Sequence, residues 1–280
     1  MMRTEQPKMI ALTDYRLPDY LIDETYLTFE LFEDYALVHA RLLMQRNPGL
    51  DTNLPALVLD GQHLELVSLA LDGRPLTAVE YTVTDKHLEL QPTHSRFELT
   101  STVRIEPQNN TALEGLYKSS GMFCTQCEAE GFRKITYYLD RPDVMSRFTT
   151  TIHADKKNYP ILLSNGNPVA QGEEEGGRHW ATWEDPFKKP AYLFAVVAGD
   201  LWCVEDTFTT MSQREVALRI YVEPENNDKC QHAMDSLKKS MRWDEEQYGR
   251  EYDLDIFMVV AVNDFNMGAM ENKGLNIFNS

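Results

Sequence analysis

The stretch "RFELTSTVRI" at residues 96–105 alternates between two kinds of side chain. Its large apolar residues all occupy odd-numbered positions: Phe97, Leu99, Val103 and Ile105. Polar residues fill the positions between them. Successive side chains of a β-strand point to opposite faces, so a period of two predicts a strand with one face against a core.

The same period recurs on both sides of this stretch, in "LTFEL" at 27–31 and in "RFTTTIHA" at 147–154. Two dipeptides between apolar runs, Asp72-Gly73 and Asn165-Gly166, are typical of hairpin turns because these residue types tolerate positive φ. Nothing between residue 20 and about residue 200 has a helical period. The pattern predicts a mainly β domain, an antiparallel β-sandwich of many short strands.

From about residue 201 the pattern changes. "EVALRIYVE" at 215–223 is one more alternating strand, and the segment 224–249 has apolar residues spaced by three and four. Those helical positions are Ala233, Met234, Leu237 and Met241. Asn227 or Asp228 is expected to cap this helix, and Gly249 to end it. "LDIFMVVAV" at 254–262 is short and continuously apolar, which is typical of a strand buried on both faces. These elements predict the opening of an α/β or α+β domain.

The charge of the chain limits its partners. Among 280 residues, 27 are Lys or Arg and 44 are Asp or Glu, a net charge of −17 at pH 7. A field of that sign repels phosphate, so nucleic acid and anionic membranes are poor candidate partners, whereas cationic ligands are attracted. The N-terminal stretch has no signal-peptide pattern, and the apolar runs are far shorter than a bilayer span. Four cysteines make no disulfide framework in a chain this long, so a cytoplasmic location is expected.

Common catalytic motifs are absent from this sequence. The seven histidines never lie four residues apart, which excludes an HExxH zinc pair, and there is no G-x-S-x-G, P-loop or G-x-G-x-x-G. "CTQC" at 124–127 could be a redox pair or half of a zinc site. Neither a helix starting at Cys127 nor a second ligand pair is evident, so two free thiols in a β-rich loop is the favoured interpretation.

The remaining candidates are carboxylates beside small residues. Glu128 and Glu130 follow "TQC", and Glu271 follows Gly268 and Ala269 near the end of the chain. Converging carboxylates can hold a substrate ammonium through charge-assisted hydrogen bonds. A backbone without bulk can approach a ligand closely, and a strand edge there could pair with an extended peptide. Glu130 is expected to face solvent.

"GAMEN" at 268–272 resembles the exopeptidase signature of the gluzincin aminopeptidases, and segments such as "TQCEAEGFRKITYYLDRPDVMSRFTT" extend the resemblance over the chain. It implies a saddle-shaped β domain at 1–200 and the start of a thermolysin-like catalytic domain at 201–280. It also implies a set of substrate-binding residues: Gln126, Glu128, Met267, Gly268, Ala269, Met270, Glu271 and Asn272. In that set Glu271 and Glu128 bind the free amine. The backbone of Gly268 and Ala269 contacts the peptide, and Met267 lines the pocket for its first side chain.

The resemblance further implies a zinc ion whose ligands lie downstream of this chain. In the family, HExxH with a distant Glu and the catalytic Tyr all follow GAMEN. No catalytic or metal-binding residue is therefore expected within these 280 residues, and the chain alone is expected to be inactive. The expected partners are peptides with a free N-terminus and the rest of the catalytic domain. The alternative is a non-catalytic β-sandwich module that binds or scaffolds a partner.

Overall fold

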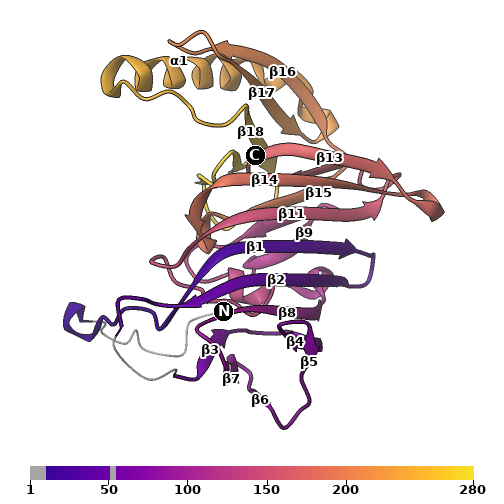
Figure 1. Ribbon diagram of the computed structural model, residues 1–280. Helices are drawn as coiled ribbons and strands as arrows, with labels where there is room; N and C mark the ends of the chain where they lie inside the picture. Colours follow the sequence, from indigo (N-terminus) through magenta and orange to yellow (C-terminus); the bar gives the residue numbers. More distant parts are fainter. Residues whose placement is uncertain (1–10, 51–54) are drawn as a thin grey trace.

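The computed structural model describes residues 11–50 and 55–280, and the strands in that part of the chain form four sheets (Figure 1). The largest sheet crosses the middle of the molecule. In spatial order its eight strands are β13 (Asn167–Glu173), β14 (Arg178–Pro190), β11 (Met145–Asp155), β1 (Tyr20–Leu31), β2 (Ala36–Arg46), β8 (Arg96–Ile105), β4 (Glu65–Leu71) and β5 (Arg74–Pro75). Its neighbouring strands are antiparallel, as predicted, except that β1 and β11 are parallel to each other.

Two smaller sheets complete the β domain. One contains β12 (Ile161–Ser164), β15 (Val196–Gly199), β10 (Met122–Gln126) and β9 (Gly115–Ser119). The other contains β3 (Leu57–Asp60), β7 (His87–Leu90) and β6 (Tyr81–Val83). One short 3₁₀ helix, η1 (Leu12–Asp14), precedes β1. Others lie between strands: η2 (Pro107–Asn109), η3 (Phe132–Lys134), η4 (Glu175–Gly177) and η5 (Ala191–Leu193). One core of buried side chains joins the three sheets.

The period of two is confirmed in the strands that build this core. Phe97, Leu99, Val103 and Ile105 of β8 are all buried, and so are the alternating apolar residues of β1 and β11. The polar positions between those of β8 are more exposed, apart from Ser101, which shares the buried face. A strand with one face in a core must alternate in this way, so the local pattern was sufficient to predict it.

Of the two dipeptides predicted to form hairpin turns, one does so and the other does not. Asp72-Gly73 joins β4 to β5 in a hairpin, with both residues at positive φ, as predicted. Asn165-Gly166 is not a hairpin, because β12 and β13 belong to different sheets. Gly166 has a φ of 92°, and a Cβ there would lie 2.1 Å from the carbonyl oxygen of Glu184. The dipeptide therefore forms a tight corner at which the chain passes from one sheet to another.

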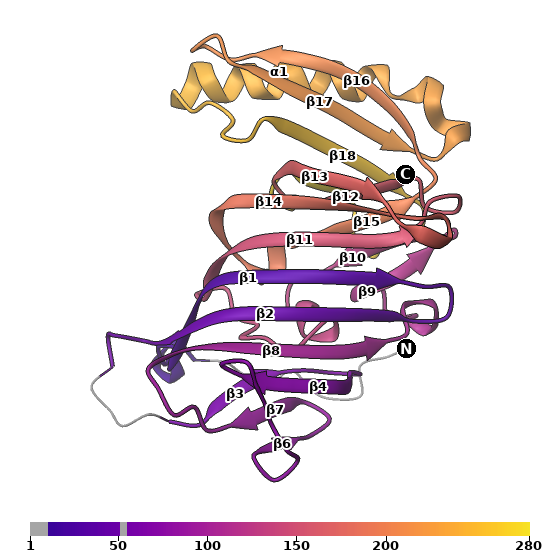
Figure 2. The same cartoon turned by 45° about the vertical axis from the view of Figure 1, so that its right-hand side comes forward.

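After residue 201 the chain forms the remaining sheet, together with one α-helix, at one end of the molecule (Figure 2). Its sheet contains, in spatial order, β16 (Trp202–Thr209), β17 (Glu215–Val222), β18 (Ile256–Val262), β20 (Leu275–Asn279) and β19 (Ala269–Met270). The helix α1 (Gln231–Tyr248) covers its outer face and follows the 3₁₀ helix η6 (Pro224–Lys229). No helix in residues 11–50 and 55–280 is long and apolar enough to cross a membrane.

The helix predicted within 224–249 is present, but the cap at its N-terminus was predicted wrongly. Asn227 and Asp228 lie inside η6, and α1 begins after Cys230 with no side-chain cap. The extra 3₁₀ turn supplies local backbone hydrogen bonds, so a polar cap is not needed at that point. Met234 and Met241 are buried as expected, whereas Ala233 is exposed.

Gly249 ends α1 in the left-handed conformation, with a φ of 61°. Replacing it with alanine is expected to lower the free energy of unfolding by about 1 kcal/mol, because a Cβ is unfavourable there. Urea denaturation followed by circular dichroism would measure the change. Ser240→Ala, at an exposed position inside α1, is the control and should leave stability unchanged or slightly raised. Equal stabilities of Gly249→Ala and the parent chain would contradict the expectation.

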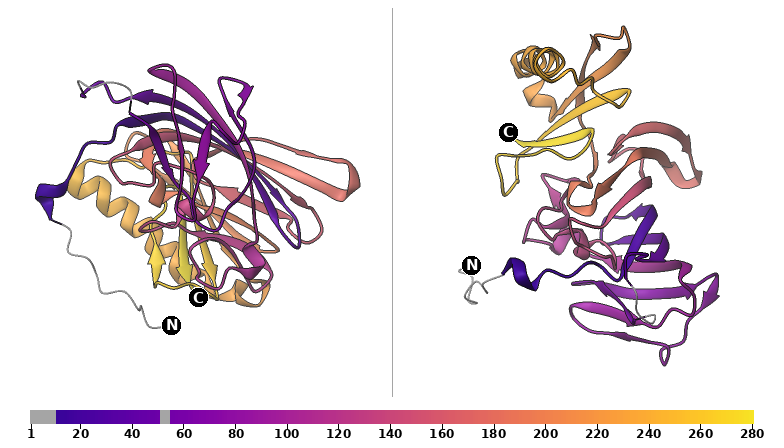
Figure 3. Two further views of the ribbon diagram at one scale, coloured as in Figure 1. Left: turned by 90° about the horizontal axis from the view of Figure 1, so that it is seen from below. Right: turned by 60° about the vertical axis from the view of Figure 1, so that its left-hand side comes forward.

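β18 lies between two cores of buried side chains. In the right-hand view of Figure 3, the yellow C-terminal strands lie between α1 and the β domain. Alternate residues, from Ile256 to Val262, are buried against the β domain, and the intervening residues pack towards α1. The prediction of a strand covered on both faces is thus correct, although the face towards α1 is only partly buried. The sheet of the C-terminal part shares a continuous core with β9, β10 and β15, so the two parts pack as one body.

Candidate functional site

The GAMEN segment contains an edge strand. Ala269 pairs with Phe278 and Met270 with Ile277, which places β19 at the end of the five-stranded sheet. The Asn279 N–H donates to the carbonyl of Gly268 at 3.0 Å and so holds the start of the strand. On its other side β19 has no neighbouring strand among the described residues. This edge is where an added extended chain can form main-chain hydrogen bonds.

The GAMEN segment, residues 268–272, contains both exposed and buried residues. Gly268, Ala269 and Glu271 are exposed, whereas Met270 and Asn272 are buried, at 0% and 1% exposure. A Cβ added at Gly268 would meet nothing within 4 Å, so this glycine adjoins open space. The Met270 side chain belongs to the shared core and anchors the strand. Both side-chain amide atoms of Asn272 are buried and have no hydrogen-bond partner among the described residues.

Gln126, at the end of β10, lies close to the residue that precedes the GAMEN segment. Its side chain is buried, and its Nε2 lies 3.3 Å from the carbonyl oxygen of Glu128 and 3.9 Å from the Met267 sulfur. The Glu128 side chain is exposed. No hydrogen bond or ion pair joins Glu128 to Glu271 within the described part of the chain. The structure therefore brings Gln126 and Glu128 to the start of the GAMEN loop, and leaves both carboxylates available to a ligand.

Glu130 does not share this arrangement. Its side chain is 68% exposed, and its carboxylate lies 3.3 Å from the guanidinium of Arg133. Arg133 in turn binds the buried carboxylate of Asp140 at 3.0 Å. Glu130 therefore faces solvent, as expected, and forms the exposed end of an ion-pair cluster whose other members are mostly buried.

Cys124, in the middle of β10, and Cys127, directly after it, are free, buried thiols. Burial raises the pKa of Cys124 to about 12 and holds the pKa of Cys127 well above its ordinary value. Only the thiolate acts as a nucleophile or metal ligand, so these environments disfavour both redox and zinc chemistry. Among the described residues, no group of three or more His, Cys, Asp or Glu side chains is arranged to hold a metal ion.

We expect Cys124 and Cys127 to resist thiol reagents in the native protein at pH 8, since burial blocks access and suppresses the thiolate. Cys203 is partly exposed, so it should react first. Labelling with a disulfide reagent, followed by peptide mass spectrometry, would assign each site. Denatured protein is the control and should label at all four cysteines. Rapid native labelling of Cys124 would contradict the interpretation.

No pattern in the sequence indicated the contacts that hold the GAMEN loop on the β domain. Ser119 and Tyr117 of β9 bind Asp264, which lies before the loop. Asn165 binds Lys273, which lies directly after it. Asn165 was singled out only as a turn residue. Such contacts are between residues more than 100 positions apart, and no local period reveals them.

The sequence comparisons define the class of protein. Residues 50–193 match the Peptidase M1 N-terminal domain, and residues 232–280 match the Peptidase family M1 domain. The chain therefore belongs to peptidase family M1, which confirms the resemblance seen in the GAMEN and TQCEA segments.

Among individual proteins, the chain is similar in sequence to bacterial aminopeptidases N. The chain is 57% identical over 279 residues to Aminopeptidase N of Caulobacter vibrioides and 56% identical over 277 residues to Aminopeptidase N of Escherichia coli. These alignments cover 100% and 99% of this chain, but 32% and 31% of the relatives. The chain thus spans about a third of their length.

A solved structure supports the fold. Aminopeptidase A of Legionella pneumophila, determined in complex with aspartic acid, matches with a TM-score of 0.92 and 37% sequence identity. The match covers 96% of this chain and 32% of that chain. The mainly β architecture with a small helical component is therefore shared with this part of that aminopeptidase.

Proposed function

We propose that this chain supplies the amine-recognition part of a zinc aminopeptidase, which releases N-terminal residues from peptides. The observation that carries the proposal is the open-edged strand β19 with the exposed Glu271 after it, beside the Gln126–Glu128 segment. Family membership and the names of the relatives support the same reaction. In this proposal residues 1–200 form the substrate-binding β domain, and residues 201–280 begin the catalytic domain.

The site supports selection of a free amino terminus. Glu271 and Glu128 are carboxylates that can accept hydrogen bonds from an ammonium group, and such charge-assisted bonds are stronger than neutral ones. The backbone of Gly268 and Ala269 would pair with the peptide main chain, and Met267 would line the pocket for the first side chain. Met270 and Asn272 would act from buried positions, by holding the loop. A carboxylate pair around the ammonium leaves no space for a preceding residue, so only terminal residues are presented for cleavage.

Zinc does not fit the residues described here, because no suitable cluster of ligands exists among them. We propose that the zinc ligands and the catalytic acid–base groups belong to sequence following residue 280. The residues of this chain then bind and orient the peptide, and they transfer no proton themselves. The four free thiols agree with a reducing compartment, and we propose a cytoplasmic location.

The test is to read the coding sequence beyond Ser280 and to assay the resulting polypeptide on an alanyl anilide. An HExxH motif downstream, and hydrolysis of the anilide to alanine and the free aniline, are expected. The N-acetylated substrate is the matched control, and it should not be cleaved because its amine is blocked. A stop codon after Ser280, or equal cleavage of both substrates, would overturn the proposal and favour a non-catalytic binding module.

A further inference from the structure

The chain entering the GAMEN loop is fastened to the β domain at Asp264. The Ser119 hydroxyl donates to Oδ2 of Asp264 at 3.0 Å and accepts the N–H of the same residue at 3.0 Å. The Tyr117 hydroxyl donates to the carbonyl of Asp264 at 2.9 Å. Ser119 and Tyr117 are 1% and 0% exposed. Three polar groups of one residue are thus bound by two buried side chains of β9.

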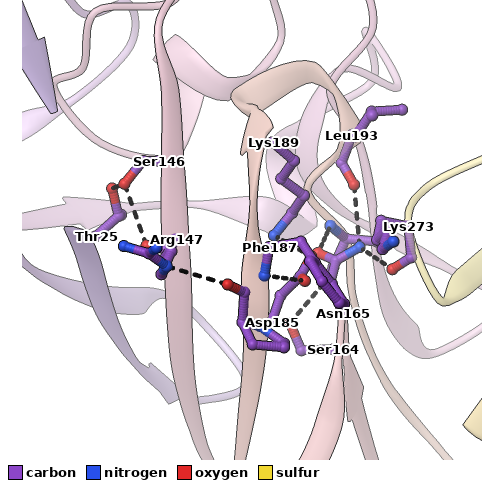
Figure 4. A network of polar contacts seen from close by, with 12 residues as sticks. Thr25, Ser146, Arg147, Ser164, Asn165, Asp185, Phe187, Lys189, Leu193 and Lys273 are labelled. Carbon is purple, nitrogen blue, oxygen red and sulfur yellow. Dashed lines mark hydrogen bonds and ion pairs between the residues drawn. The ribbon is translucent and has the colours of Figure 1, made fainter. Parts of the chain in front are cut away.

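The chain leaving the loop is fastened at Lys273, as Figure 4 shows. Asn165 Nδ2 donates to the carbonyl of Lys273 at 2.8 Å and to that of Leu193 at 3.0 Å, while its Oδ1 accepts the Ala195 N–H at 2.7 Å. Asn165 is 3% exposed. The Lys273 ammonium binds the carboxylate of Asp253 at 2.7 Å. Both ends of the five-residue segment 268–272 are therefore held, while its exposed residues lie between them.

We propose that Ser119 and Asn165 are positioning residues, which hold the loop in the geometry that binds the substrate amine. This inference rests on the proposed function of Glu271. Both residues are buried and bond to the chain flanking the loop, so they act on the substrate through the loop and do not touch it. Pre-ordering a binding loop lowers the entropy lost when the ligand binds. A loop that is no longer held in place should therefore weaken substrate binding more than it slows the chemical step.

The first measurement uses hydrogen–deuterium exchange on this chain, carrying Ser119→Ala or Asn165→Ala. Amides at 264–274 should exchange about tenfold faster in each variant, since buried hydrogen bonds that restrain the loop are lost. Two matched controls remove similar side chains elsewhere. Ser146→Ala loses a buried hydroxyl bonded to Thr25 and to the Arg147 carbonyl, and Asn47→Ala loses a buried amide bonded to the Pro18 carbonyl. The controls should leave exchange at 264–274 unchanged.

The second measurement is the kinetics of the full-length polypeptide on an alanyl anilide. Ser119→Ala should raise KM about five- to tenfold, with kcat within about twofold of the parent. A merely structural role would instead reduce the folded fraction, which lowers kcat and leaves KM unchanged. Asn165→Ala should act in the same direction. If it fails to fold, Ser119→Ala decides the outcome, because this change removes a single atom from the side chain.

Three results would overturn the proposal. Exchange at 264–274 that is unchanged in both variants would show that these bonds do not order the loop. An unchanged KM in both variants, when Glu271→Ala raises KM, would refute the positioning role and leave the proposed function standing. An unchanged KM in Glu271→Ala itself would refute the proposed function, and the positioning role with it.

Discussion

Replacing Glu271 with alanine should raise the KM for peptides with a free amino terminus by roughly 100-fold in the full-length polypeptide. The carboxylate is exposed next to an open strand edge, so it is available to an ammonium group that docks beside β19. A hydrogen bond between charged groups contributes about 1.5–3 kcal/mol, and each 1.4 kcal/mol is about tenfold in affinity. The value of kcat should also fall where the ammonium helps to align the scissile bond.

Steady-state kinetics on an alanyl anilide would measure this effect. Glu271→Gln keeps the size of the side chain and one acceptor oxygen but removes the charge, so its KM should lie between those of the parent and Glu271→Ala. Glu175→Ala removes another exposed glutamate, in the turn between β13 and β14, and should leave the kinetics unchanged. Unchanged kinetics for Glu271→Ala would refute the assignment of this residue to the amine.

Loss of the Lys189 ammonium is expected to have the largest effect on stability. Lys189 and Asp185 lie on β14, 3% and 0% exposed, with Nζ 3.1 Å from Oδ2 (Figure 4). The ammonium also lies 4.0 Å from the centre of the Phe148 ring. Burial lowers the pKa of Lys189 to about 8, so the group is still mostly charged at pH 7. Lys189→Ala leaves a buried carboxylate without its partner, which costs about 3–5 kcal/mol of unfolding free energy.

Urea denaturation at pH 7 would test this effect on the isolated chain. The neighbouring Lys188 is a matched control, since it is more exposed and forms a surface ion pair with Asp23 at 3.0 Å. Lys188→Ala should change the unfolding free energy by less than about 1 kcal/mol. The double variant Asp185→Asn with Lys189→Met removes both charges and should recover most of the loss. Equal destabilisation by Lys188→Ala and Lys189→Ala would contradict the role of the buried pair.

Much of the β domain could be predicted from local pattern, because one face of each core strand must be apolar. This holds for β8 and β1, and also for β17, in which Val216, Leu218 and Ile220 are buried. The errors arose where a local signal has two possible tertiary outcomes. Asn165-Gly166 is a turn in any arrangement, but the sheets that its flanking strands join depend on distant partners.

For the candidate site, the sequence singled out two segments but did not indicate that they lie close together. Residue type singles out Glu128, Glu271 and the small residues before Glu271, whereas only the resemblance to a family implies Gln126 and Met267. The proximity of the two segments rests on a contact between Gln126 and Met267, 141 positions apart. The fastening of the loop at Asp264 and Lys273 could not be predicted, since serine and asparagine at Ser119 and Asn165 carry no distinctive local signal.

The sequence by itself determined the strand character of the β domain, the helix that ends at Gly249, and the family signature with its exposed carboxylates. These features depend on side-chain period, backbone preference and residue identity, which are local properties. Only the tertiary structure decided that the sheet after residue 201 closes its core on β9, β10 and β15, and that the GAMEN loop is held from both ends. Such contacts form only when distant segments are folded together, because burial is what makes their hydrogen bonds and packing favourable.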